Sequence, residues 1–333
     1  MPYSEPVTTS IVRRRPSGRL SHSFVASPGA AVARKRLLDL SIGLVEDVGH
    51  AGPSPAQGPE AFSPAFQVCL PYRGLFIWHV GREDVVGDAN QVVLVTGGEY
   101  YRLSNPLSAG YAELIITPDV DVLSQMLQVD LAQLPRHQLF RQRSWAVDPR
   151  VQAFRARFLH WAHSGVVDDL EAEVVVLALL RTTLQAKVLR TDIHGSTREL
   201  VRCTKEFLEA HYVHPISLTD VGRAVGASPA YLTDVFHRSE GIPLHHYLTR
   251  LRLAHALVEL PHADDLALLA LDLGFSSHSH FSAVFRRTFG LTPSQFREST
   301  RRGARPDPAE LPRDREGPGE EFLTRRARRP MRR

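Results

Sequence analysis

The sequence is poor in cysteine and contains no long apolar run. Only Cys69 and Cys203 occur among its 333 residues, which excludes a disulfide framework and a four-cysteine metal cluster. No apolar stretch is long enough to span a membrane. The basic cluster at residues 13–15 is not followed by the apolar core that a signal peptide needs. These absences favour a cytoplasmic protein with both cysteines reduced.

An excess of one charge sign is also absent over most of the chain. Residues 197–297 contain ten Lys or Arg and ten Asp or Glu, and the formal net charge of +4 arises after Arg297, where eleven Arg accompany seven acidic residues. Residues 299–333 have little apolar content, so we expect a disordered Arg-rich tail. Such a tail either adds salt-sensitive attraction to nucleic acid or has no specific role.

A short pattern occurs twice near the C-terminal end, 49 residues apart, and this indicates two copies of one structural unit. The first copy comprises Ser228, Leu232, Thr233, Val235, Phe236, Arg238, Ser239, Gly241, Ile242 and Tyr247. The second comprises Ser277, Phe281, Ser282, Val284, Phe285, Arg287, Thr288, Gly290, Leu291 and Phe296.

Each copy predicts a helix with one apolar stripe, because its large apolar residues recur at i, i+3 and i+4. Ser228 before Pro229 suits a helix start, and Gly241 and Gly290 suit left-handed helix ends. A short helix is expected before each copy, over Leu218–Val225 and Asp265–Leu273, with a glycine at the turn. Helix, tight turn and helix is the arrangement whose second helix can enter the DNA major groove.

From Thr197 to Arg297 the chain resembles the AraC/XylS-type transcription regulators. The resemblance rests on many family positions in order. They are Ser217-Leu218-Thr219-Asp220, Gly226-Ala227-Ser228, Tyr231-Leu232, Phe236, Gly241-Ile242-Pro243, Arg252-Leu253, Ala256, Gly274-Phe275, His280-Phe281, Phe285-Arg286-Arg287, Gly290-Leu291-Thr292-Pro293 and Phe296-Arg297. The resemblance implies an all-α domain of two helix-turn-helix units joined by a long helix.

The joining helix is also predicted by periodicity, since an apolar stripe runs from Leu244 to about Leu260. If it holds the two reading helices on one face roughly 34 Å apart, one chain can read two successive major grooves.

The resemblance implies that small and polar side chains of the two reading helices contact bases. The candidates are Ala230, Thr233, Asp234, His278, Ser279, Ser282 and Ala283. Thr and Ser can bond base edges or phosphate, Ala can touch a thymine methyl, and Asp can accept from cytosine. In the competing interpretation these side chains are simply solvated, with Asp234 paired to Arg238.

For phosphate contacts the candidates are Arg250, Arg252, Arg286 and Arg287, although Arg252 stands at a family position that can be structural.

Between Pro64 and Pro118 the pattern changes to short β-rich runs separated by Gly, Asp and Asn turns. The runs are Phe66–Leu70, Leu75–Val80, Gln91–Thr96, Tyr100–Leu103 and Tyr111–Thr117. They predict a small β-barrel or sandwich, which resembles the cupin-like N-terminal domain of AraC-type regulators.

We expect this barrel to hold neither a metal nor a cofactor. His79 is its lone histidine, with Glu83, Glu99 and Glu113 scattered around it, whereas an enzymatic cupin needs clustered ligands. An effector pocket is instead assigned to aromatic and basic side chains, with core packing as their alternative role. These are Tyr72, Arg73, Trp78, Tyr100, Tyr101 and Arg102.

Two helices are expected after the barrel, over residues 149–163 and 168–190. The second carries a heptad-like stripe of Leu170, Val174, Leu177, Leu184 and Val188. This stripe either forms a homodimer contact, as the resemblance implies, or packs on the barrel.

The expected organisation is thus an α+β multidomain chain. Its parts are a poorly ordered segment 1–60, a cupin-like β domain 61–147, a helical segment 148–190, a linker 191–196, a double helix-turn-helix domain 197–298 and a tail 299–333.

The expected function is that of a sequence-specific regulator of transcription, not of an enzyme. We expect it to bind double-stranded DNA, a small-molecule effector and RNA polymerase. The alternatives are a cupin-type metalloenzyme fused to a DNA-binding domain and an architectural DNA-binding protein.

Overall fold

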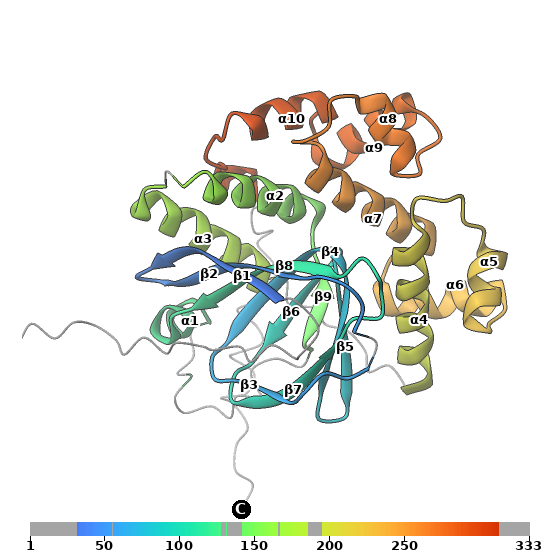
Figure 1. The fold of residues 1–333 in the computed structure, drawn as a ribbon, viewed down its shortest axis with the longest axis horizontal. Helices are drawn as coiled ribbons and strands as arrows, with labels where there is room; N and C mark the ends of the chain where they lie inside the picture. The colour runs from blue at the N-terminus through green and yellow to red at the C-terminus, as the bar shows by residue number, and fades with distance from the viewer. Residues whose placement is uncertain are drawn as a thin grey trace, which may run out of the picture.

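The computed structural model describes residues 32–54, 56–127, 131, 142–165, 167–185 and 195–312. Within these ranges a β-rich N-terminal domain is followed by two covering helices and a C-terminal helical domain (Figure 1). This is the α+β architecture that the sequence predicts. The strands are β1 (Val32–Leu40), β2 (Gly43–His50), β3 (Ala61–Ser63), β4 (Gln67–Val80), β5 (Glu83–Asp88), β6 (Gln91–Val95), β7 (Glu99–Ser104), β8 (Tyr111–Pro118) and β9 (Ser144–Ala146).

The central strand β4 changes partners along its length. Its first half pairs with β6 and β8, and its second half pairs with β5 and β7. The change falls at Gly74, which has a φ of +69°, and a Cβ there would lie 2.0 Å from the carbonyl oxygen of Gly110. The strand can bend at this point because glycine has no side chain. As a result, the sheet with order β1-β2-β8-β4-β6-β9 curves into a barrel-like double layer.

The expectation of a poorly ordered segment over residues 1–60 is wrong for 32–50, which form β1 and β2. The basic residues of β1 hide this strand in the sequence. In the structure Arg34 pairs with Glu46 of β2 at 2.5 Å, while Val45 and Val48 are buried. Residues 1–31 lie outside the described part of the chain. β4 likewise joins two expected runs into one strand, and β5 occupies residues that were expected to form turns.

Helices α2 (Pro149–His163) and α3 (Asp169–Gln185) lie over the sheet beside β1 and β2, and the short α1 (Val120–Leu127) lies on the same side, close to α3 and the turn between β1 and β2 (Figure 1). The start of α2 follows from its sequence, since Asp148 accepts a hydrogen bond from the Arg150 amide ahead of Pro149. Phe154 and Phe158 of α2 and Leu179 of α3 join Leu70 and Leu114 of the sheet in one core. These helices therefore complete the barrel domain.

The stripe on α3 divides between two environments. Leu184 is buried in the barrel core and Leu177 packs against it, which fits the packing interpretation for this part of the stripe. Leu170 and Val174 are 70% and 47% exposed. Val188 lies outside the described residues.

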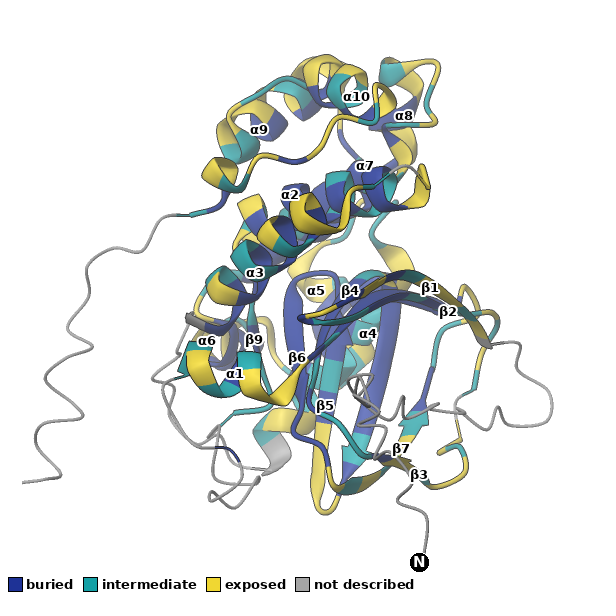
Figure 2. Cartoon of the chain, turned by 90° about the vertical axis from the view of Figure 1, so that its left-hand side faces the viewer, coloured by how far each residue is buried: buried dark blue, intermediate teal, exposed yellow. Residues whose placement is uncertain are grey.

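The C-terminal domain is all helical and has two apolar clusters. Its helices are α4 (Gly195–His211), α5 (Leu218–Val225), α6 (Pro229–Glu240), α7 (Leu244–Glu259), α8 (Leu266–Asp272), α9 (His278–Phe289) and α10 (Pro293–Arg301). Helix α7 contributes Leu251 to one cluster and Leu257 to the other, so it connects the two halves. Figure 2 shows α7 lying beside α2, with buried residues on both helices. The expected linker comprises residues 191–196. Residues 195 and 196 are the first two residues of α4, and residues 191–194 lie outside the described part of the chain. No helix in the described ranges is long and apolar enough to cross a membrane.

The expected disordered tail is wrong for residues 299–312. Helix α10 continues to Arg301, and a 3₁₀ turn follows at Pro308–Glu310. Leu311 is buried in the core formed by the barrel, α2 and α3, and Glu310 pairs with Arg157 of α2. A single apolar residue and a few charges are too weak a sequence signal to predict that the chain comes back to the barrel domain after α10. Residues 313–333 lie outside the described part.

Candidate nucleic-acid interface and barrel cavity

The first helix-turn-helix unit consists of α5 and α6. Helix α5 begins with a capping box, in which Ser217 and Asp220 satisfy each other's backbone amides. The turn passes through Gly226 in the left-handed conformation, with a φ of 69°. Helix α6 then buries Leu232 and Phe236 and leaves its other face to solvent.

The second unit, α8 and α9, repeats this construction. Asp265 caps α8, and Gly274 forms the turn. Helix α9 buries Phe281 and Phe285, the counterparts of Leu232 and Phe236. Both second helices have a serine N-cap and a left-handed glycine at the C-terminal end. The internal duplication in the sequence is thus a duplication of structure.

The base-contact candidates of α6 lie at its solvent-facing side. Ala230 and Asp234 are exposed, whereas Thr233 is half-buried and its hydroxyl lies 3.0 Å from the carbonyl oxygens of Pro229 and Ala230. The hydroxyl proton is therefore used within the helix, and its oxygen remains an acceptor. Asp234 pairs with Arg238 at 2.5 Å, as the competing interpretation expects. This pair also moderates the repulsion that Asp234 would exert on phosphate.

The candidates of α9 lie at the matching positions. His278, Ser279 and Ala283 are exposed, and Ser282 is half-buried with its hydroxyl 3.3 Å from the Nε2 of His278. Helix α9 therefore presents a small, polar surface with few charges. At its C-terminal end stand Arg286 and Arg287, both exposed.

Of the four arginines assigned to phosphate, Arg252 has a structural role. Its guanidinium donates to the carbonyl oxygens of Tyr212 at 2.7 Å and His214 at 2.9 Å, after the end of α4. Burial also lowers the pKa of Arg252. Its assignment to phosphate is therefore corrected, and it fixes the loop between α4 and α5. Arg250 is half-buried, so Arg286 and Arg287 are the more accessible cations.

A buried polar network joins the barrel domain to the first helix-turn-helix unit. Asp88 accepts from the Tyr247 hydroxyl of α7, and Gln91 donates to Glu240, the last residue of α6, at 2.9 Å. Lys205 of α4 lies 3.1 Å from Glu240 and 3.8 Å from Asp88. All five side chains are buried. This interdomain network was not predicted, because its members are far apart in the sequence and polar.

The second unit also contacts the N-terminal domain. Ala153 of α2 is buried in the same cluster as Leu257 of α7 and Phe281 of α9, and Ala156 of α2 packs against it. Figure 1 shows α2 lying beneath α9 and α10 and beside α7. Both helix-turn-helix units are therefore held by the barrel domain and its helices.

The barrel contains a cavity of about 40 Å³ between its two sheet layers. Of the six side chains assigned to an effector pocket, Trp78 and Tyr101 line it. The other four do not line this cavity and lie elsewhere on the domain. The Tyr72 hydroxyl donates to Asp47, Arg73 is exposed, Tyr100 is 63% exposed against Phe62, and Arg102 lies 3.9 Å from Glu60.

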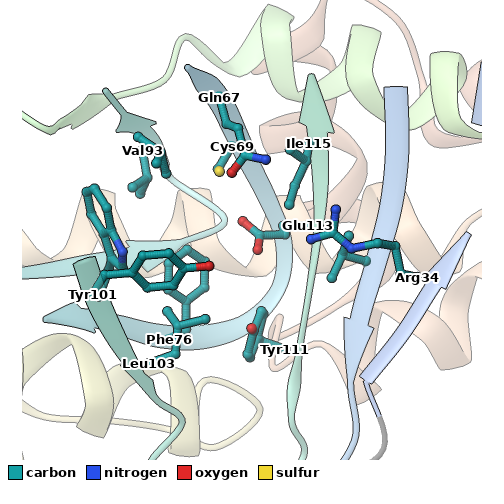
Figure 3. Close-up of a pocket in the computed structure, with 13 residues that line it drawn as sticks. Arg34, Gln67, Cys69, Phe76, Val93, Tyr101, Leu103, Tyr111, Glu113 and Ile115 are labelled. Carbon is teal, nitrogen blue, oxygen red and sulfur yellow. The ribbon is translucent and has the colours of Figure 1, made fainter. Parts of the chain in front are cut away.

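The sequence analysis missed Glu113 as a cavity residue. Its carboxyl group points into the space bounded by Cys69, Tyr101 and Tyr111 (Figure 3). Burial raises the pKa of Glu113 to about 7, while Arg34 and a hydrogen bond with Cys69 act in the opposite direction. Burial likewise raises the pKa of Tyr101 to about 12 and that of Tyr111.

The histidine and acidic residues considered as metal ligands lie in separate places. His79 contacts Asp84 at 2.7 Å and Ser104 at 2.8 Å, and both Glu83 and Glu99 pair with Arg143. Among the described residues, no group of three or more potential ligands forms a metal site.

Comparison with known proteins matches the C-terminal domain to one type of fold. A family model described as a helix-turn-helix domain matches residues 221–299. The regulatory protein PocR of Salmonella typhimurium is 34% identical over 101 residues, which cover 30% of this chain and 33% of PocR. The HTH-type transcriptional activator RhaR of Klebsiella pneumoniae is 32% identical over 133 residues, covering 39% of this chain and 47% of RhaR.

A solved structure also matches about a third of this chain. It is a transcriptional regulator of the AraC-type DNA-binding-domain class from Chromobacterium violaceum, 28% identical, covering 32% of this chain and 96% of that chain with a TM-score of 0.30. The present chain spans less than half the length of each curated relative named above.

Proposed function

We propose that this chain, whose C-terminal domain is an AraC-type double helix-turn-helix domain, is a sequence-specific DNA-binding regulator of transcription. The observation that carries the proposal is the pair of structurally matched helices, α6 and α9. Each has one buried stripe and an opposite polar face, and α7 joins the two units. Two such helices on one chain can read two successive major grooves.

In this proposal, bases are read by short side chains. Ala230, Thr233, Asp234, His278, Ser279, Ser282 and Ala283 make the base contacts. Thr233 acts mainly as a hydrogen-bond acceptor, because its hydroxyl group already donates to carbonyl oxygens of its own helix, whereas the Ser282 hydroxyl contacts only the Nε2 of His278. Arg250, Arg286 and Arg287 neutralise phosphate.

Control by the N-terminal domain is proposed to pass through the interdomain network. Glu240 ends the first reading helix and Tyr247 lies on the joining helix, and both bond to residues flanking the turn between β5 and β6. Meanwhile α2 contacts the second unit. An effector that favours one arrangement of the barrel thereby changes the spacing of the reading helices, provided that its affinity differs between the arrangements.

The remaining assignments complete the proposal. The barrel binds a small-molecule effector, and RNA polymerase is a partner during transcription. Leu170 and Val174, exposed on α3, form part of a homodimer contact. The protein acts in the cytoplasm and performs no covalent chemistry.

Selection of duplexes from a randomised DNA pool by the full chain tests this function. We expect a motif with two elements about one helical turn apart. Thr233→Ala should relax one element and Ser282→Ala the other, because each removes one contact from one reading helix. Ser124→Ala on α1 is the matched control and should leave the motif unchanged. Tight binding with no recovered motif would instead identify an architectural DNA-binding protein.

Two arginine substitutions separate phosphate binding from structure. Arg287→Met should weaken binding to all duplexes similarly and reduce the slope of log affinity against log salt by about one. Arg252→Met should leave that slope unchanged but lower the free energy of unfolding by about 2 kcal/mol, since two carbonyl groups lose a charged donor. Titrations at several salt concentrations and denaturant unfolding measure the two effects. If Arg252→Met instead reduced the salt slope and left the free energy of unfolding unchanged, Arg252 would be a phosphate contact.

A further inference from the structure

The joining helix α7 has two histidines in its first turn. His245 and His246 are exposed, and their ring centres lie 4.2 Å apart. The same turn contains no acidic residue. Because the N-terminal end of a helix carries a partial positive charge, acidic residues stabilise this position and protonated histidines destabilise it. The stability of α7 therefore does not explain the two histidines.

Two arginines extend these histidines into a cluster of basic groups. Arg250 follows His246 by one turn of α7, and Arg287 stands in the last turn of α9. Desolvation and the charges of His245, Arg250 and Arg287 lower the pKa of His246. The four side chains are therefore close enough to act on one another, and His246 is mainly neutral at pH 7 in the free protein.

The elements around the cluster leave it without a neutralising carboxylate. Helices α2 and α9 and strand β4 pack near α7 and contain no acidic residue. On α6, Asp234 is paired with Arg238 and Glu240 with Lys205. The three glutamates of α4 contact Arg202 or His255. In a domain with equal numbers of basic and acidic residues, this surface has an excess of basic groups.

The cluster also lies between the two reading helices. Helix α7 begins just after α6 ends, and Arg287 belongs to α9. When α6 and α9 enter successive major grooves, the DNA backbone between the grooves crosses the region that separates the two helices. Phosphate groups of that backbone can therefore reach the cluster.

We propose that His245 and His246 are proton-linked phosphate contacts, which bind the DNA backbone between the two reading helices together with Arg250 and Arg287. A phosphate oxygen favours the protonated ring, so binding makes the histidines take up protons. This inference rests on the proposed function. It adds a dependence on pH that arginine contacts alone do not provide, because arginine stays charged.

The direction of this dependence follows from the two states of His246. Its pKa is lowered in the free protein and rises when a phosphate lies beside the ring. The gain in DNA affinity is therefore complete below the pKa of the free protein, and it is lost as the pH rises through the pKa of the complex. Each histidine contributes at most about tenfold in affinity per pH unit.

Binding of the full chain to a fluorescent duplex of mixed sequence, at constant ionic strength, tests the inference. Between pH 6 and pH 8 we expect the affinity of the wild type to fall about tenfold more than that of the double variant His245→Gln/His246→Gln. His246→Arg supplies a permanent charge and should bind at pH 8 nearly as well as the wild type binds at pH 6. His262→Gln alters an exposed histidine beyond the opposite end of α7 and should keep the wild-type pH dependence.

Calorimetric titration in two buffers with different heats of ionisation measures the proton uptake directly. We expect uptake at pH 7 by the wild type and less uptake by the double variant. Denaturant unfolding at pH 6 and pH 8 should show that both proteins are folded over this range. An equal pH dependence of the two proteins, or equal proton uptake, would overturn the inference.

The same measurements separate this inference from the proposed function. A motif recovered from the randomised pool, together with unchanged pH dependence in the double variant, rejects the histidine contacts alone. Proton-linked binding to all duplexes without a motif rejects sequence-specific reading and retains the histidine contacts. Binding to no duplex at any pH rejects both.

Discussion

Replacing Lys205 by methionine is expected to lower the free energy of unfolding of the full chain by about 3–5 kcal/mol at pH 8. Lys205 lies between Glu240 and Asp88, and its removal leaves two buried carboxyl groups without their cation. Methionine retains most of the side-chain volume, so the loss reports charge and not packing. Denaturant unfolding, followed by circular dichroism, measures the change.

A matched substitution and a change of pH check this result. Lys35→Met removes an exposed ammonium group of β1 and should cost little. The effect of Lys205→Met should shrink at pH 5, because burial already raises the pKa of Asp88 and the carboxyl group can then take up a proton. If Lys205→Met costs no more than Lys35→Met, the network does not hold the domains together.

The second large effect is a pH-dependent gain of stability from Glu113→Gln. The pKa of Glu113 is raised from 4.5 to about 7 in the folded protein. The folded state therefore binds the proton more tightly than the unfolded state. The resulting stabilisation is complete below pH 4.5 and is lost as the pH rises through 7. A shift of this size corresponds to about 3 kcal/mol.

Unfolding free energies of the wild type and Glu113→Gln should therefore diverge as the pH rises. We expect the variant to be more stable by about 3 kcal/mol at pH 8 and close to the wild type at pH 4.5. All other titrating groups are shared and cancel in the difference. A difference that does not vary between pH 4.5 and 8 would show that Glu113 keeps an ordinary pKa.

The helix-turn-helix units could be predicted because their signals are local. Ser217, Ser228, Gly241 and Gly290 lie next to the helices that they start or end, and the structure has caps at each of them. Apolar spacing within one helix was sufficient to identify Leu232 and Phe236 as buried.

The barrel was predictable only in part, because strand faces depend on register. Tyr100 and Tyr101 are adjacent in β7 and so point to opposite faces, and the sequence alone does not say which one faces the cavity. In β1, three consecutive basic residues precede Leu37 and Leu38, so the alternation typical of a strand is missing and the strand was concealed. The pairing of Arg34 with Glu46 appears only once β1 and β2 are placed side by side.

The interdomain network had no local signal at all. Gln91 and Glu240 are 149 positions apart, and Asp88 and Tyr247 are 159 apart. In the sequence, each of these residues taken alone is typical of a solvated polar side chain. Only the packing of α4, α6 and α7 against the barrel makes them partners.

The return of Leu311 to the barrel core has a consequence for biosynthesis. A chain that emerges from the ribosome N-terminus first normally completes its first domain before the second is made. Here the core shared by the sheet, α2 and α3 lacks one of its buried residues until position 311 has been synthesised. The core of the barrel is therefore complete only after the helix-turn-helix domain has been synthesised. Until then, the nascent chain carries a barrel core that lacks Leu311.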